Sequence, residues 1–318
     1  MRILVIGGSS FVGRAIVQEA IDRGHEVTLF NRGKTDPGAF PTAEHLTGDR
    51  NGDLAALRGR EWDATVDVCA YVPAQVRSLL DALGAGAGHY TFISTISVYD
   101  YQKAGAGFGE DGPLLEPAWD EQMTPEKYGN LKVACEQLAH EIAGDRLLVV
   151  RPGFVLGPHD PTHRFTYWVE RVAEGRAPIA GPNADQPLQG VDARDLGAFT
   201  MSQIDKQVVD VFHVTSPDPP LPFETALQQI ASGVGAQLPE VRWIGPKAEL
   251  PLTVPPSHYA ILQAGLAKAR QAGLSERPMA DTARDTLEWV QGERAAARYP
   301  EHLGVGPTPE KEQELLAR

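Results

Sequence analysis

Short apolar runs alternate with segments of helical periodicity along the first half of the chain. The runs are rich in β-branched residues, as in strands that are buried on both faces of a parallel sheet. The segments between them repeat apolar residues every three or four positions, which predicts helices. We expect strands at 3–6, 25–31, 44–48, 63–70, 89–95 and 147–150, and helices at 11–21, 73–83 and 125–144. This alternation predicts an α/β fold with a doubly wound parallel sheet of the Rossmann type.

The second half of the chain has a more mixed pattern and predicts a second, smaller domain. Residues 188–192 and 208–214 are expected to return to the sheet as strands, on either side of a helix at 193–204. We therefore assign residues 1–154 and 187–215 to a dinucleotide-binding domain, and residues 155–186 and 216–318 to a smaller α/β C-terminal substrate-binding domain. In that domain we expect helices at 223–232, 259–272 and 281–291, a strand at 241–244, and a terminal helix or frayed tail at 310–318.

Residues 101–125 are rich in glycine and proline and carry no periodic pattern. A connection of this length in a compact α/β domain is usually functional. We expect it to form a flap beside the active site.

The turn after the first predicted strand has the composition of a phosphate-binding loop. Gly7 and Gly13 occupy two positions of a Gly-x-x-Gly-x-x-Gly pattern, and Ser10 stands at the middle one. A strand-to-helix turn directs free backbone N–H groups and the positive end of a helix dipole at one point. We expect this turn to bind a pyrophosphate through Gly7, Ser9, Ser10, Phe11, Val12 and Gly13.

The end of the second predicted strand indicates which dinucleotide is preferred. NAD-binding proteins usually place an acidic residue there for the adenosine ribose. Asn31, Arg32 and Lys34 stand there instead, and Arg14 is expected nearby. Cations at this point suit the 2′-phosphate of NADP, so we expect NADP rather than NAD; a solvated basic loop is the alternative. Asp49, after the third strand, is expected near the adenine.

Composition and charge narrow the function classes. The formal net charge of −13 argues against a partner that is nucleic acid or an anionic membrane surface. Cys69 and Cys135 lie in apolar contexts, which predicts two buried thiols in a reducing compartment. The first strand begins at residue 2 and no apolar run is long enough to span a bilayer. We expect a cytoplasmic protein.

Tyr128 and Lys132 lie four residues apart on the helix expected at 125–144. This spacing places the phenol and the ammonium on one helix face. A free tyrosine titrates near pH 10, and a neighbouring cation would favour the phenolate and lower its pKa. The pair is therefore a candidate for acid–base catalysis, although surface Tyr–Lys pairs of this spacing are common.

Four motifs in this order resemble the extended short-chain dehydrogenases/reductases, the NAD(P)-dependent epimerase/dehydratase superfamily. They are GGSSFVG at 7–13, TISVY at 95–99, YGNLK at 128–132 and RPGFVLGP at 151–158. The resemblance implies that Tyr128 is the general acid/base, that Lys132 binds the nicotinamide ribose, and that Thr95 hydrogen-bonds the reacting oxygen. It also implies that Ala70, Tyr71, Pro152 and Gly153 contribute to cofactor binding.

Departures from the family pattern limit which reactions are expected. Sugar dehydratases of the group carry Asp-Glu after the catalytic threonine, but Ile96-Ser97 follow here. Gln186 stands where many nucleotide-sugar enzymes carry an arginine for the diphosphate. The substrate is expected to meet polar groups that follow the RPGFVLGP motif. Candidate substrate contacts are Ser97, His159, His163, Arg164, Tyr167 and Gln186; His159 and His163 lack a third ligand, so no metal site is expected.

The sequence thus predicts an NADP-dependent oxidoreductase that transfers a hydride between nicotinamide and a carbonyl or secondary alcohol of a small molecule. Two alternatives stay open: an NAD(P)-dependent sugar epimerase, and a non-catalytic nucleotide-sensing or RNA-associated relative. The retention of Thr95, Tyr128 and Lys132 favours an enzyme. A homodimer is a further expectation.

Overall fold

A seven-stranded parallel sheet forms the centre of the structure, a computed structural model that describes residues 1–120, 122–245, 249–300 and 304–317. The strand order is β11-β6-β5-β4-β1-β2-β3, and every neighbouring pair is parallel. The strands are β1 (Arg2–Ile6), β2 (Glu26–Asn31), β3 (Glu44–Thr47), β4 (Ala64–Asp67), β5 (His89–Ile93), β6 (Leu147–Pro152) and β11 (Asp210–Val214). The predicted α/β, Rossmann-type sheet is confirmed.

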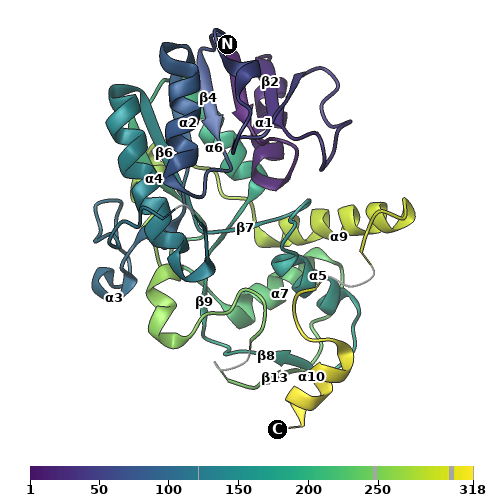
Figure 1. Ribbon diagram of the computed structural model, residues 1–318. Helices are drawn as coiled ribbons and strands as arrows, with labels where there is room; N and C mark the ends of the chain where they lie inside the picture. The colour runs from purple at the N-terminus through teal and green to yellow at the C-terminus, as the bar shows by residue number, and fades with distance from the viewer. Residues whose placement is uncertain (121, 246–248, 301–303, 318) are drawn as a thin grey trace.

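Helices cover both faces of this sheet (Figure 1). On one face, α1 packs against α6 and closes one apolar core; on the other face, α2 packs against α4 over a second core. The helices are α1 (Phe11–Asp22), α2 (Pro73–Leu83), α4 (Tyr128–Ala143) and α6 (Ala193–Asp205). Short 3₁₀ turns lie at Ala55–Leu57, Gly84–Ala87, Ile96–Val98, Pro125–Lys127 and Gly144–Arg146.

A third apolar core holds the remaining helices together below the sheet (Figure 1). Its helices are α5 (Arg164–Ala173), α7 (Phe223–Gly233) and α9 (Met279–Ala295), with α10 (Pro309–Leu316) beside the small strands. Three two-stranded pairs complete it: β7 (Phe154–Leu156) with β10 (Gly190–Asp192), β9 (Pro187–Leu188) with β12 (Leu221–Pro222), and β8 (Ile179–Gly181) with β13 (Val241–Trp243). The division into two domains at residues 154, 187 and 215 stays a prediction.

Two predicted elements of the second half were wrong. Residues 188–192 do not return to the main sheet, because they are divided between β9 and β10 and pair with β12 and β7. The helix expected at 259–272 is a 3₁₀ segment (Pro256–Leu262) followed by α8 (Ala267–Gln271). Gly265 separates the two, and its N–H donates to the carbonyl of Phe108 at 2.9 Å, so the chain leaves its helical path to contact the segment at 101–125.

The segment at 101–125 is folded onto the molecule at several points. It begins with one short helix, α3 (Tyr101–Ala104), and Tyr99 and Leu114 form an isolated antiparallel bridge. Its part in a closing motion stays a prediction.

The C-terminal helix α10 is held by a buried ion pair. Glu312 is 1% exposed, and its carboxylate accepts hydrogen bonds from Arg171 Nε at 2.9 Å and from the N–H of Ala180 at 3.1 Å. Arg176 completes the set with an N–O distance of 3.1 Å. Of the two forms expected for residues 310–318, the structure therefore has the packed helix.

Removing this carboxylate should destabilise the protein strongly. Breaking a buried ion pair leaves an unpaired charge inside and typically costs about 3–5 kcal/mol. We expect Glu312→Ala to lower the free energy of unfolding in urea by about that amount, whereas Glu288→Ala, an exposed position on α9, should change it by less than about 0.5 kcal/mol. Equal effects of the two substitutions would show that the pair contributes nothing to stability.

Candidate active site

The turn between β1 and α1 is built by glycines that no other residue could replace without strain. Gly7 and Gly8 have φ angles of +104° and +87°, in the region that side chains rarely adopt. A Cβ on Gly13 would lie 2.7 Å from the backbone nitrogen of Gly8, so this glycine lets α1 approach the turn. Ser10, in contrast, is an exposed N-cap with an extended backbone at φ −138°. Its position does not need glycine, which explains how the turn tolerates the serine.

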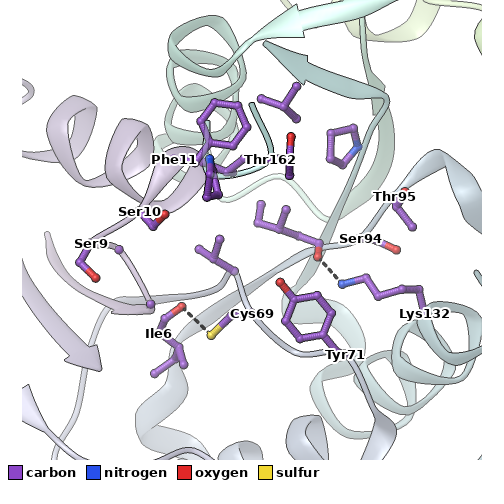
Figure 2. A pocket seen from close by; sticks show the side chains of 18 of the residues that line it. Ile6, Ser9, Ser10, Phe11, Cys69, Tyr71, Ser94, Thr95, Lys132 and Thr162 are labelled. Atoms are coloured by element: carbon purple, nitrogen blue, oxygen red, sulfur yellow. Dashed lines mark hydrogen bonds between the residues drawn. The ribbon is translucent and has the colours of Figure 1, made fainter. Parts of the chain in front are cut away.

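A single cavity of about 800 Å³ extends from this turn to the carboxyl ends of β5 and β6. It brings together most of the predicted site residues. For the cofactor these are Gly7, Ser9, Ser10, Phe11, Val12, Asn31, Arg32, Lys34, Asp49, Tyr71, Pro152 and Gly153; for catalysis Thr95, Tyr128 and Lys132; and for the substrate Ser97 and Arg164. Figure 2 shows Ser9, Ser10 and Phe11 on one side of this space and Thr95, Tyr71 and Lys132 on the other.

Besides Arg14, which is described below, six predicted residues do not line the cavity. Gly13 acts through packing, as described above, and Ala70 is buried with its carbonyl bonded to Lys132. The other four are predicted substrate contacts, His159, His163, Tyr167 and Gln186, and their roles stay predictions.

These four side chains make other contacts in the fold. Gln186 is completely buried and donates from Nε2 to the carbonyl of Leu252 at 3.0 Å. Tyr167 belongs to the third apolar core, since both faces of α5 are covered by α7 and α9. His159 and His163 lie against the ring of Trp289 on α9. The absence of an arginine at position 186 therefore says nothing about the substrate.

Two cations at the adenine end of the cavity have no acidic partner. Arg32 and Lys34 are exposed, and neither forms an ion pair within the described ranges 1–120, 122–245, 249–300 and 304–317. Arg14, the third predicted cation, pairs with Asp36 at 3.0 Å and lies outside the cavity lining. Arg32 and Lys34 are thus the groups available to a phosphate there.

A buried ion pair beneath the turn was missed by the sequence analysis. Arg50 places Nη1 and Nη2 at 2.6 and 2.9 Å from the two carboxylate oxygens of Asp67, which also accepts from the hydroxyl of Tyr90 at 3.0 Å. Asp67 is fully buried at the end of β4. An acidic residue that ends an apolar strand was the available signal, because such a carboxylate needs a buried partner.

At the other end of the cavity, α4 brings Tyr128 to Thr95. A Cβ on Gly129 would lie 2.1 Å from the carbonyl oxygen of Ser97, so only glycine lets the helix approach this closely. Tyr128 and Thr95 both line this end of the cavity, and the Thr95 hydroxyl accepts a hydrogen bond from the N–H of Ser97 at 3.1 Å. Thr95, Ser97 and Tyr128 thus lie on one wall of the cavity.

The pKa of Tyr128 is raised to about 12, mainly because the phenol is buried; the Thr95 hydrogen bond and the Arg164 charge oppose the rise. The predicted lowering below the ordinary value is therefore wrong for this state of the protein. Lys132 donates to the carbonyls of Ala70 at 2.9 Å and Ile93 at 2.7 Å, the latter drawn as a dashed line in Figure 2. Burial lowers the pKa of Lys132 to about 8.

A second missed feature is a buried polar network behind Thr95. Glu136 on α4 accepts from Ser94 Oγ at 2.5 Å and forms a two-point pair with Arg151 on β6. Arg151 also donates to the Tyr99 hydroxyl, which lies 2.6 Å from Nε2 of His213 on β11. The network joins the strand ends that carry the active-site wall.

The lowered pKa of Lys132 makes a test by pH titration possible. The folded protein releases this proton near pH 8, whereas an exposed lysine does so near pH 10.5. Between these values the unfolded state binds more protons, so the free energy of unfolding should rise with pH. Urea unfolding from pH 7 to 11 measures the free energy of unfolding of wild type and of Lys132→Met. We expect the wild-type value minus the Lys132→Met value to increase between about pH 8 and 10.5.

The exposed Lys206→Met variant is the control, and its difference from wild type should stay constant with pH. Parallel curves for wild type and Lys132→Met would show that Lys132 titrates like a surface lysine.

Comparison with known proteins gave distant sequence relatives. No family model matches the chain. The chain is 23% identical over 270 residues to the chloroplast stem-loop binding protein of 41 kDa b of Arabidopsis thaliana, covering 77% of this chain and 66% of that protein, so it spans just under two thirds of that relative. It is 26% identical over 258 residues to the 2-alkyl-3-oxoalkanoate reductase of Stenotrophomonas maltophilia (strain K279a), covering 74% and 76% of the two chains.

Solved structures share the fold over nearly the whole chain. The UDP-glucuronic acid 4-epimerase from Bacillus cereus, solved in complex with NAD, superposes on this chain with a TM-score of 0.68 at 16% identity. The match covers 92% of this chain and 99% of that one. None of the helices that the structure describes is long and apolar enough to cross a bilayer. The chain therefore shares the fold of this NAD-complexed epimerase, in agreement with the fold that its motifs led us to expect.

Proposed function

We propose that this chain is an enzyme, an NADP-dependent oxidoreductase that transfers a hydride between nicotinamide and a carbonyl or secondary alcohol of a small molecule. One observation carries the proposal: a single cavity joins a glycine-rich strand-to-helix turn to a wall that carries Tyr128, Thr95 and Lys132 together. A nucleotide-binding protein without catalytic activity needs the turn but has no use for the Tyr128–Thr95 pair.

The residues present fit a nicotinamide dinucleotide. The backbone at Ser9–Val12 and the N-terminus of α1 would hold the pyrophosphate, in a turn whose glycines leave room for it. Arg32 and Lys34 would pair with a 2′-phosphate, and Asp49 lies at the same end of the cavity. When bound, the nicotinamide supplies or accepts the hydride.

The active-site side chains have the protonation states that a carbonyl reduction needs. With a pKa of about 12, Tyr128 is a neutral phenol at pH 7 and can donate its proton to the oxygen of a carbonyl that is being reduced. Thr95 would orient that oxygen through its hydroxyl. Lys132 would turn from the carbonyls of Ala70 and Ile93 toward the ribose hydroxyls, and Tyr71 lines the same wall.

The relatives support this class and leave two alternatives to be tested. One relative is named as a reductase of an oxoalkanoate and one structure is an epimerase, and an epimerase would use the same groups without net consumption of cofactor. The relative named as a stem-loop binding protein makes RNA association the other alternative. The net charge of −13 argues against it. A cytoplasmic location and a homodimer remain predictions.

The catalytic assignment of Tyr128 can be tested by removing its hydroxyl. Tyr128→Phe keeps the ring but cannot transfer a proton, so kcat for NADPH-dependent carbonyl reduction should fall by about 10²–10⁴, with an unchanged Kd for NADPH. Tyr101→Phe, outside the cavity lining, is the matched control and should keep full activity. Full activity in Tyr128→Phe would remove this residue from the mechanism.

The cofactor preference can be tested at Arg32. A charge-assisted hydrogen bond to phosphate contributes about 1.5–3 kcal/mol, so NADPH should bind at least about tenfold more tightly than NADH, and Arg32→Ala should remove most of the difference. Calorimetry gives both dissociation constants, and Lys206→Ala controls for the loss of a surface charge. Equal affinities of the wild type for NADPH and NADH would exclude NADP specificity.

A further inference from the structure

The substrate end of the cavity combines mainly apolar side chains with hydroxyl groups and one free cation. Besides Thr95 and Tyr128, the hydroxyls of Ser97 and Thr162 belong to the described lining, and Arg164 is the one cation at this end besides Lys132. The apolar lining residues are Ile96, Phe154, Val155, Pro161, Val254, Ile261 and Leu262. A ligand that fills this end must therefore be largely apolar and must also satisfy a guanidinium.

Arg164 is held in place but its outer nitrogens are free. It is the first residue of α5, its Nε donates to Thr162 Oγ1 at 3.1 Å, and its Cζ lies 5.0 Å from the centre of the Phe154 ring. Neither Nη1 nor Nη2 has a hydrogen-bond partner or a carboxylate within 4.0 Å in the part of the chain that the structure describes. Arg164 is half-buried, whereas Arg50, Arg151 and Arg171, whose side chains are at most 9% exposed, each pair with a carboxylate.

A neighbouring carboxylate, Asp160, bonds Thr162 through one oxygen, and its second oxygen is buried without a hydrogen-bond partner among the described residues. Asp160 is 1% exposed, and its Oδ1 accepts from the N–H and the hydroxyl of Thr162, at 2.8 and 2.7 Å. It therefore orients the threonine that in turn orients Arg164, without forming an ion pair with the guanidinium. The two free nitrogens of Arg164 are left for a group that enters the cavity.

The Arg164 guanidinium and the proposed acid, Tyr128, face the same cavity. Arg164 and Tyr128 line one cavity, and the positive charge of Arg164 opposes the rise in the pKa of Tyr128. A substrate whose oxygen reaches Tyr128 and Thr95 would therefore place a neighbouring substituent at Arg164.

We propose that the substrate is an oxo acid: a carbonyl compound with an apolar body and a carboxylate near the reacting carbon, which Arg164 binds through both free nitrogens. This inference rests on the proposed function and adds the substrate class. A single free guanidinium matches the two oxygens and the single charge of a carboxylate. In the reduction, the carbonyl carbon gains a hydride from NADPH, which leaves as NADP⁺; the C=O π bond breaks, and the oxygen gains the proton of Tyr128. The carboxylate is unchanged.

The test compares acids with their uncharged esters. Medium-chain 2-oxo and 3-oxo acids and their methyl esters are assayed by NADPH oxidation, with wild type, Arg164→Gln, Arg164→Lys and the exposed control Arg58→Gln. We expect lower KM values for one acid series than for its esters, and a roughly 10- to 100-fold rise in the KM of the acids in Arg164→Gln. The esters should be unaffected, Arg164→Lys should recover part of the loss, and Arg58→Gln should match wild type.

Binding of the same acids to the NADP-loaded protein, measured by calorimetry, separates this inference from the proposed function. If no probe consumes NADPH, the proposed function fails, and loss of acid binding in Arg164→Gln still supports the anion site. Equal use of acids and esters by wild type would overturn the inference while the oxidoreductase activity stands. Weaker NADPH binding in Arg164→Gln with an unchanged acid-to-ester ratio would also overturn it, because Arg164 would then serve the pyrophosphate.

Discussion

The buried ion pair between Glu136 and Arg151 is the interaction on which the arrangement of the active-site wall depends. It joins α4 to β6, and through Ser94 it reaches the residue next to Thr95. Arg151 then connects to Tyr99. Loss of either charge would leave the other unpaired in the interior, at a typical cost of about 3–5 kcal/mol. The helix that carries the proposed acid and the loop that carries the proposed threonine are therefore held at a constant separation.

The cavity is lined mainly by cations, although the chain as a whole is acidic. The chain has a formal net charge of −13, but five cations and one carboxylate, Asp49, are found among the described residues that line the cavity. The cavity lining thus attracts an anionic ligand such as a dinucleotide, whereas the net charge of the whole chain disfavours anionic polymers. The lining cations are Arg32, Lys34, Arg50, Lys132 and Arg164.

Features that depend on local sequence could be predicted well. The strand–turn–helix at the N-terminus and the Tyr128–Lys132 pair are set by neighbouring residues, and the parallel sheet places their elements at one edge. Features that depend on contacts between distant segments could not be predicted from the sequence. Nearly every side chain from 165 to 172 is buried, because α5 is packed between α7 and α9, so its sequence does not show which residues face the cavity. Tyr167 was assigned to the substrate for this reason, whereas Gln186 was assigned from the position of an arginine in the family pattern. The partners Arg50 and Asp67 were missed.

We propose above all that one nicotinamide dinucleotide lies along the cavity from the β1–α1 turn to Tyr128, with its reactive ring at Tyr128 and the substrate end left free. A crystal structure of the protein grown with NADP⁺ tests this directly. The account predicts density for the pyrophosphate at Ser9–Val12, the 2′-phosphate within hydrogen-bond distance of Arg32 or Lys34, and the nicotinamide ribose on Lys132. A dinucleotide bound with its nicotinamide away from Tyr128, or a cavity without NADP⁺ at saturating concentration, would contradict it.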